Sequence, residues 1–269
     1  MRPNQSRSTR FLASAAIVVA IGAATAGCQT TQVADNTNSI ALSSEQRPEA
    51  DLRHDVEIYG EKYHTNPTDV NVALHYAQAL RSTGQYAQAA AVLEQVSMQN
   101  PHNRAVLGEY GRALAENGDY QQALAVLDRA HTPDQPDWHI LSAQGAVLDQ
   151  MSKHEDAQRY YQAALKIAPD EPSVLSNLGL SYALSKDLKN AEATLRRAAA
   201  HQPVDPRVRQ NLALVVGLQG RFAEAESIAQ ADLPPDEAAA TVAYLRQMLA
   251  GKGGAPPDRH AARSDAGSS

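Results

Sequence analysis

A sequence pattern that recurs at a constant interval constrains this chain more than any other feature. The Gly-Gln-Tyr segment at 84–86 recurs as Gly-Asp-Tyr at 118–120, and the same interval continues along the chain without an insertion. The units, all of equal length, are residues 70–103, 104–137, 138–171, 172–205 and 206–239. A constant period of this kind is typical of arrays in which each unit is one supersecondary structure that buries its apolar face against its neighbours.

Small residues recur at two positions of every unit. They are Ala77, Gly111, Gly145, Gly179 and Ala213 at the eighth position, and Ala89, Ala123, Ala157, Ala191 and Ala225 at the twentieth. Small side chains at both positions let two antiparallel helices approach closely. Glycines at 84, 118 and 220 predict the end of the first helix, and prolines at 67, 101, 169 and 203 predict the end of the second.

A helix-turn-helix unit of about 34 residues with this pattern resembles the tetratricopeptide repeat (TPR). The resemblance implies an all-α fold, a solenoid of helix pairs wound into a right-handed superhelix. We expect capping helices at 51–65 and 235–250, because stacked repeats need polar ends, so the solenoid would span 48–250. The pattern weakens where unit two has Gln135 instead of Pro, and where unit five has Ala229 instead of a large apolar residue.

The segment 1–27 predicts a secretory signal peptide. Three Arg precede an almost wholly apolar or small stretch, 11–27, which leads to Cys28, the only Cys of the chain. This arrangement resembles a bacterial lipobox, whose Cys is lipidated, although Thr25 stands where an aliphatic residue is usual. Because Gln29 follows the Cys instead of Asp, the resemblance implies the periplasmic face of the outer membrane. The alternatives are ordinary cleavage near 24–26, which gives a soluble periplasmic protein, and an uncleaved anchor.

Segments 28–47 and 251–269 contain few large apolar residues and predict a disordered tether and a disordered tail. The chain has 24 basic and 30 acidic residues, a net charge of −6. Removal of 1–27, which carry three Arg and no acidic residue, would take this charge from −6 to −9. The acidic balance disfavours nucleic acid as a partner, so membrane attachment would depend on the acyl chains.

The sequence carries no catalytic motif. It has no phosphate-binding loop after a strand, no nucleophile elbow and no His-Glu-x-x-His segment. The nine His are scattered without an i, i+4 pair, so surface or packing roles are favoured over metal binding. We therefore expect a protein that is not an enzyme and needs no cofactor or metal. A hydrolase or transferase carried on a TPR scaffold would need a second domain, for which no room remains outside 48–250.

A helical solenoid offers a concave groove lined by the first helix of every unit. Carried over from TPR proteins, the groove positions of the early units are polar, among them Arg81, Glu109, Arg112, Glu116 and Asp149. No groove position is Lys, so the clamp by which some TPR domains hold a C-terminal carboxylate is absent. The candidate partner-binding residues lie in units four and five, and are Asn177, Leu180, Leu184, Arg207, Asn211, Leu214 and Leu218.

Leucines with interleaved amides suit an amphipathic helix or an extended peptide, because the amides can hold its backbone and the leucines its apolar face. The alternative is that these leucines pack against the closing helix 236–250 or narrow the groove until it is shut. The residues alone favour neither.

Three segments of the C-terminal third, 177–184, 205–226 and 244–249, are similar to the TadD family of TPR lipoproteins of the Flp (tight adherence) pilus system. The resemblance extends over 11–250, and 172–249 separates this family from other TPR proteins. It implies a lipid-anchored assembly factor that helps the outer-membrane secretin, or other pilus assembly proteins, to assemble or stay localised. The alternative is a pilotin-like lipoprotein, or an adaptor for cell-wall enzymes, of another envelope system.

Overall fold

The computed structural model describes residues 49–132 and 134–253. The chain divides into two compact units, Met1–Glu45 and Gln46–Ser269, and the first lies wholly outside the described residues. The expected signal peptide, Cys28, the tether and the tail from 254 onward therefore also lie outside them.

Within the described residues the chain forms α-helices and no strand. The helices are α1 (Glu49–Thr65), α2 (Val70–Ser82), α3 (Tyr86–Gln99), α4 (Arg104–Asn117), α5 (Tyr120–Asp128), α6 (Trp138–Gln150), α7 (His154–Ile167), α8 (Pro172–Leu184), α9 (Leu188–Ala199), α10 (Pro206–Leu218), α11 (Phe222–Ala229) and α12 (Pro235–Gly253).

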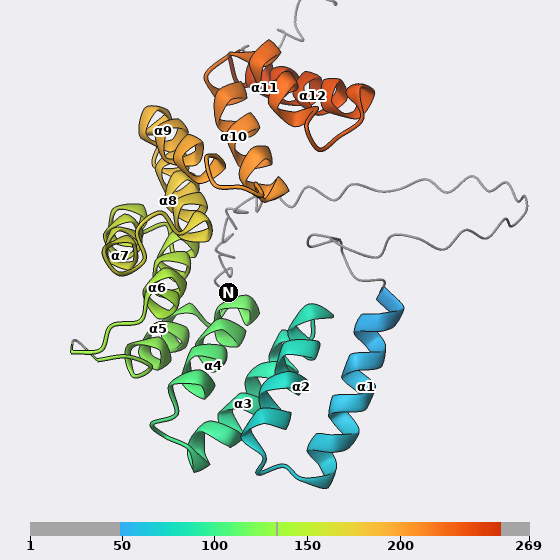
Figure 1. Ribbon diagram of the computed structural model, residues 1–269, viewed down its shortest axis with the longest axis vertical. Coiled ribbons are helices and arrows are strands. Elements are labelled where there is room, and N and C mark those ends of the chain that lie inside the picture. Colours follow the sequence, from blue (N-terminus) through green and yellow to red (C-terminus); the bar gives the residue numbers. More distant parts are fainter. Residues whose placement is uncertain (1–48, 133, 254–269) are drawn as a thin grey trace, which may run out of the picture. The chain divides into compact units, whose positions relative to one another are not determined.

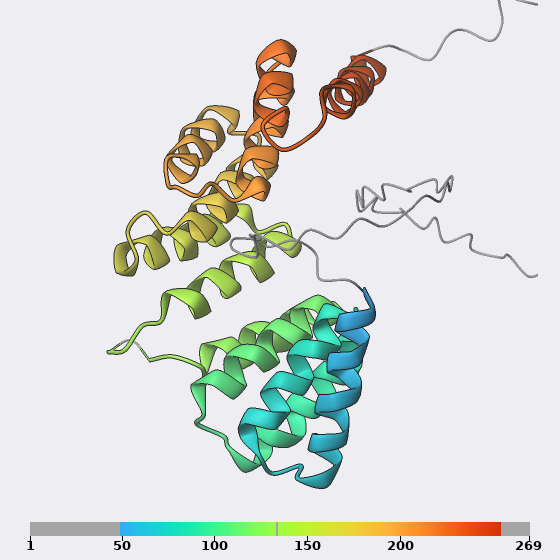
Figure 2. The same ribbon diagram turned by 45° about the vertical axis from the view of Figure 1, so that its right-hand side comes forward.

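The helices pack in chain order, each against the next (Figures 1 and 2). Besides these contacts, α2 touches α4, α4 touches α6, α6 touches α8 and α8 touches α10, so the first helices of successive pairs lie side by side in a row. α12 contacts both α10 and α11, the two elements that the first helix of another pair would contact. This row is the surface on which a TPR groove forms.

One acidic or amide residue starts every first helix. Asp69, Asn103, Asp137, Glu171 and Asp205 stand at the same point of successive repeats, and each side chain accepts a hydrogen bond from a backbone N–H of the first helical turn. Such a cap satisfies a donor that has no partner inside the helix, and contributes typically about 1 kcal/mol. The N-caps therefore fix where each first helix begins within its repeat.

The small residues at the eighth position hold the two helices of a pair together. A Cβ on Gly111 would lie 2.4 Å from Leu127 Cγ, one on Gly179 would lie 2.6 Å from Leu195 Cγ, and one on Gly145 would meet the ring of Tyr161 at 2.7 Å. The alanines at the twentieth position, 89, 123, 157, 191 and 225, are all completely buried. The close approach predicted from small residues is confirmed.

The turn inside each pair uses the left-handed backbone region at one position. The φ values are +75° at Gly84, +92° at Gly118 and +81° at Gly220, where glycine predicts the end of the first helix. Ser152 and Lys186 occupy the same position with φ of 59° and 68°. The turn geometry is therefore common to all five pairs, although two of them lack the glycine.

The weak points of the sequence pattern coincide with short second helices. α5 ends at Asp128 and α11 at Ala229, whereas α3 and α7 have 14 residues each.

The predicted capping helices are present, but α1 begins at Glu49 rather than 51, and α12 extends through Gly251 to Gly253 rather than ending at 250. Gly251 has no left-handed φ, so it does not terminate the helix as a C-terminal glycine would. None of the described helices combines the length and the apolar character needed to cross a bilayer.

Candidate functional site: the groove of the first helices

Four of the candidate partner-binding residues meet in one cleft. The cleft lies between α8 and α10 and has a volume of about 570 Å³. Its lining includes Asn177 and Leu180 from α8, and Arg207 and Asn211 from α10. The Arg207 side chain is 78% exposed, which leaves its charge in water. A cleft of this size lies within the range of small-ligand and side-chain sites.

The two asparagines also join neighbouring repeats. Asn177 Nδ2 donates to Ser142 Oγ at 3.4 Å, and Asn211 Nδ2 donates to Ser176 Oγ at 3.0 Å. Each bond runs back from one first helix to the preceding one, so α6, α8 and α10 are linked in series. The amide oxygens of both residues make no hydrogen bond within the described residues, and they remain available as acceptors for a bound backbone.

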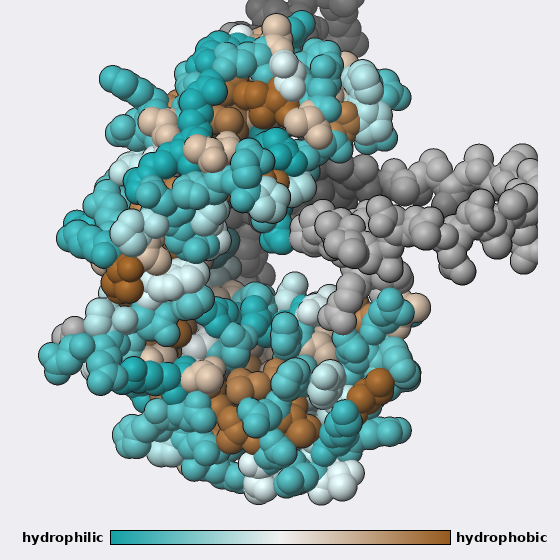
Figure 3. All heavy atoms as spheres, viewed as in Figure 1, coloured by the Kyte–Doolittle hydropathy of each residue, from teal (hydrophilic) through white to brown (hydrophobic). Residues whose placement is uncertain are grey.

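The leucines of units four and five are not buried. Leu184 is 57% exposed and Leu214 is 42% exposed, while Leu180 and Leu218 are half-buried. Figure 3 shows hydrophobic side chains gathered on the surface over α10. α12 packs on α10 through Ala238 and Val242, which are buried with residues of α10, and through Leu245, which lies against Gly217. Within the described residues, the closing helix therefore leaves Leu184 and Leu214 open to solvent.

The groove over the first two pairs is charged, and its charges pair with one another. Arg81 donates to both carboxylate oxygens of Glu116, at 2.6 and 2.7 Å, and also contacts Glu109, which in turn contacts Arg112. Burial lowers the pKa of Arg81, but the hydrogen bonds and charges of Glu116 and Glu109 outweigh it and raise that pKa above its usual value. This group contains two Arg and two Glu and has no net charge.

One expected groove residue belongs to the interior instead. The Asp149 side chain is only 10% exposed and accepts hydrogen bonds from Ser181 Oγ at 2.8 Å and from Tyr161 Oη at 3.1 Å. His154 Nδ1 lies 2.8 Å from the same carboxylate. Burial, and then the Asp149 charge, raise the pKa of Tyr161 well above its ordinary value. Asp149 therefore ties α6 to α7 and α8 and is not offered to a partner.

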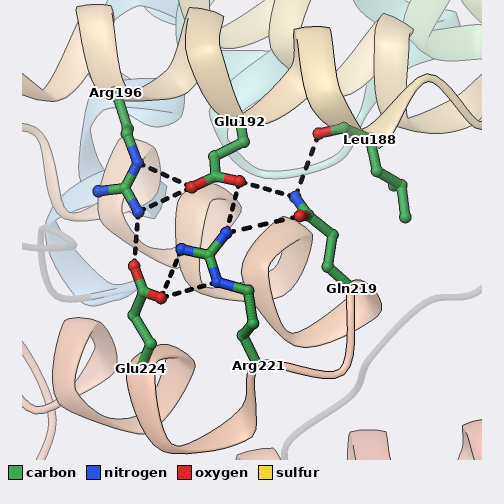
Figure 4. Close-up of polar contacts among 6 residues, drawn as sticks. All are labelled: Leu188, Glu192, Arg196, Gln219, Arg221 and Glu224. Carbon is green, nitrogen blue, oxygen red and sulfur yellow. Dashed lines mark hydrogen bonds and ion pairs between the residues drawn. The ribbon is translucent and has the colours of Figure 1, made fainter.

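The densest polar network lies on α9, α11 and the turn before α11 (Figure 4). Glu192 accepts from Arg196 Nε at 2.8 Å and from Arg221 Nη1 at 2.7 Å, and both arginines also contact Glu224. Gln219 Nε2 adds a bond of 2.9 Å to Glu192. Burial raises the pKa of Glu192, but the hydrogen bonds from Arg221, Gln219 and Arg196 bring it down to about 2. Sequence reasoning missed this network because its partners come from two different units.

No group of three His, Cys, Asp or Glu side chains converges as metal ligands do in residues 49–132 and 134–253. The polar side chains described above are joined in ion pairs and interhelical hydrogen bonds, and none of them makes a nucleophile–base arrangement with an open approach.

The comparisons with known proteins agree with this architecture. Two family models, both described as tetratricopeptide repeat, match residues 80–145 and 143–206. No curated protein matches the sequence. The solved structure of PilW, described as a widely conserved type IV pilus biogenesis factor, has a TM-score of 0.62 and 18% identity over 72% of this chain and 91% of that one.

A chain of the APC/C hetero-tetramer Cut9–Hcn1 has a TM-score of 0.57 and 16% identity over 72% of this chain and 40% of its own length. At these identities the likeness concerns the fold. The chain is therefore a tetratricopeptide-repeat protein with the all-α fold of stacked helix pairs.

Proposed function

We propose that this protein is a membrane-tethered TPR scaffold that helps to assemble or localise the Flp (tight adherence) pilus apparatus. It does so by binding a segment of a pilus assembly protein, with the outer-membrane secretin as the first candidate, in the groove of α8 and α10. The exposed leucines carry the proposal, because Leu184 and Leu214 face solvent beside a cleft that holds the amides of Asn177 and Asn211.

The geometry suits an amphipathic segment. Fully burying an exposed leucine side chain contributes roughly 1.5–3 kcal/mol. Leu184 and Leu214 are each about half exposed, so completing their burial would together contribute about as much as one such leucine. The amide oxygens of the two asparagines can accept hydrogen bonds from a partner. A charged side chain of the partner would gain little here, because charges of both signs line the α8–α10 cleft. The positive charge is that of Arg207, and the negative charges are those of Glu171 and Asp205.

The assignment to the Flp system rests on the similarity of residues 177–184, 205–226 and 244–249 to the TadD family. PilW is a type IV pilus biogenesis factor with the same fold, so a TPR solenoid is compatible with pilus assembly. A pilotin-like lipoprotein or a cell-wall enzyme adaptor would use the same groove for another partner.

A binding measurement tests the groove. The full chain is titrated against the purified Flp secretin, and compared with a Leu184→Asp/Leu214→Asp variant. Both positions are exposed, so helicity by circular dichroism should be unchanged. We expect the variant to bind at least about tenfold more weakly, since truncating a central contact typically costs more than about 1 kcal/mol.

Met98→Asp is the matched control, because Met98 is an apolar side chain that is 71% exposed on α3. It should bind as the unchanged chain does. Equal affinity of the double variant and the control, with both folded, would rule out α8 and α10 as the binding surface.

Cys28 is proposed as the membrane attachment point. Mass spectrometry of the mature protein should find a diacylglycerol-modified N-terminal Cys28, and a Cys28→Ser variant should leave the outer-membrane fraction. A Cys28→Ser protein that still fractionates with the outer membrane would overturn the lipid anchor while leaving the groove untouched.

A further inference from the structure

The groove has a hollow at α6, the middle one of the five first helices. α6 carries Ala143 and Ala146 at the positions where α4 carries Glu109 and Arg112. The short side chains leave a cleft of about 540 Å³ between α4, α6 and α8, separate from the α8–α10 cleft except for its rim at Ser173 and Asn177. Ala146 is exposed at the floor of this hollow, which we call the α6 cleft.

One wall of the α6 cleft is aromatic. Trp138 is the first residue of α6 and the only Trp of the chain, and its half-buried ring lines the cleft. His139 stacks on one side of the indole, with ring centroids 3.5 Å apart and an angle of 23° between the planes. The stack holds the indole in place, so its remaining surface is a fixed apolar wall that another ring could contact by its edge or face.

The wall formed by α2 and α4 offers hydrogen-bond donors without a net charge. Arg81, Glu116, Glu109 and Arg112 are paired in series, so their charges cancel. Arg112 uses Nη1 for Glu109, while its Nε and Nη2 have no hydrogen-bond partner in the described parts of the chain. These donors can serve a neutral acceptor, such as a backbone carbonyl or a phenol oxygen, and the wall gives a carboxylate or an ammonium no net attraction.

We propose that the α6 cleft is an anchor pocket for one uncharged aromatic side chain, Phe or Tyr, of the protein segment bound in the groove. This rests on the proposed function insofar as the groove binds a protein segment. The short side chains of Ala143 and Ala146 leave room for the aromatic ring, and Trp138 contacts it. Arg112 donates a hydrogen bond to the backbone carbonyl next to the anchor residue. Aromatic anchors in desolvated pockets dominate the energetics of many interfaces, so this cleft would set which segments the groove accepts.

The test uses the full chain and N-acetyl-L-phenylalaninamide as the probe, with Trp138 emission and its indole NMR signal as reporters. A ligand of this size that fits should saturate with a dissociation constant of about 1 mM. N-acetyl-L-leucinamide should bind at least about fivefold more weakly, because it lacks the ring, and N-acetyl-L-lysinamide should give no saturable change.

Ala146→Leu fills the hollow at an exposed position and should raise the dissociation constant at least about tenfold. Met98→Asp lies outside the α6 cleft and should leave probe binding unchanged. The proposal is overturned by a Trp138 signal that does not saturate, by equal binding of leucinamide, or by full binding to a folded Ala146→Leu protein. Secretin binding that depends on Leu184 and Leu214 would survive such a result, so the two proposals fail separately.

Discussion

At the scale of single residues, the turn inside each helix pair shows how much a repeat constrains its sequence. All five pairs place a residue just after the first helix at a left-handed φ, and units one, two and five use glycine there. Ser152 and Lys186 adopt the same geometry at a steric cost, because a Cβ approaches the following carbonyl oxygen in this region. The fold therefore imposes the left-handed turn even at Ser152 and Lys186, whose side chains disfavour that backbone conformation.

Replacing Ser152 or Lys186 by glycine should stabilise the protein. Removing the left-handed strain gains about 1–2 kcal/mol, and the greater freedom of glycine in the unfolded chain returns about 0.5–1 kcal/mol. The expected net gain is roughly 0.5–1 kcal/mol per substitution, measured by urea unfolding. Gly84→Ala, at φ +75°, should lose stability in the same assay. A loss of stability in both glycine variants would show that another contact of Ser152 and Lys186 matters more.

Gly145→Ala should destabilise the chain although it adds a better helix former. The new Cβ would stand 2.7, 2.8 and 2.9 Å from three atoms of the Tyr161 ring, which is buried and bonded to Asp149. The propensity gain is about 0.5–1 kcal/mol and overpacking costs about 1–3 kcal/mol, so we expect a net loss of about 1 kcal/mol in thermal or urea unfolding.

Gly251→Ala is the control for this substitution, since nothing lies within 4 Å of its Cβ position. It should be neutral or slightly stabilising. If Gly145→Ala matched the control, the close approach of α6 and α7 would not be needed for packing.

At the scale of elements, the sequence predicts which helices exist and the structure adds how they are tied together. The repeat period and the recurring small residues predict the helix pairs. The missing Pro in unit two and Ala229 in unit five mark the two pairs whose second helix is short. Hydrogen bonds between units could not be predicted, because they depend on side-chain directions across a helix interface. Asp149 shows this, since its partner Ser181 belongs to the next unit and turns an expected groove residue into an interhelical tie.

The Glu192 network gives α9 and α11 a pH-dependent connection. The pKa of Glu192 is about 2 in the folded protein, and about 4.3 is usual for an unfolded chain, so the ionised form is favoured by folding. Its contribution to stability is present above about pH 4.3 and is lost as the pH falls toward about 2. The unchanged chain should therefore be more stable than Glu192→Gln at pH 7, and this difference should shrink as the pH falls through that range.

Thermal melts of both proteins over this pH range measure the effect. Glu49→Gln is the control, because Glu49 pairs with Arg53 on the exposed surface of α1, where an ion pair contributes little to stability. Its melting temperature should differ little from that of the unchanged chain. A difference between Glu192→Gln and the unchanged chain that stays constant down to about pH 2 would contradict the assigned charge of Glu192.

At the scale of the whole molecule, the repeat pattern predicts the groove but only part of its function. Asn177, Leu180, Arg207 and Asn211 were expected to lie together, and they line one cleft, because groove positions follow from the helical register. The hollow at α6 was not predicted, since Ala143 and Ala146 look like ordinary helix residues until their neighbours are known. Sequence alone also left the exposure of Leu184 and Leu214 open, because that depends on where α12 packs.

The proposed function is that the leucine-lined groove of α8 and α10 serves pilus assembly. The most direct measurement counts surface Flp pili, and the secretin multimer, in cells whose only copy of the protein carries Leu184→Asp/Leu214→Asp. With the variant present at normal abundance, we predict that pili and multimer fall to the level of a deletion strain, while Met98→Asp cells keep both. Normal pili and normal secretin multimer in the deletion strain itself would contradict the claim.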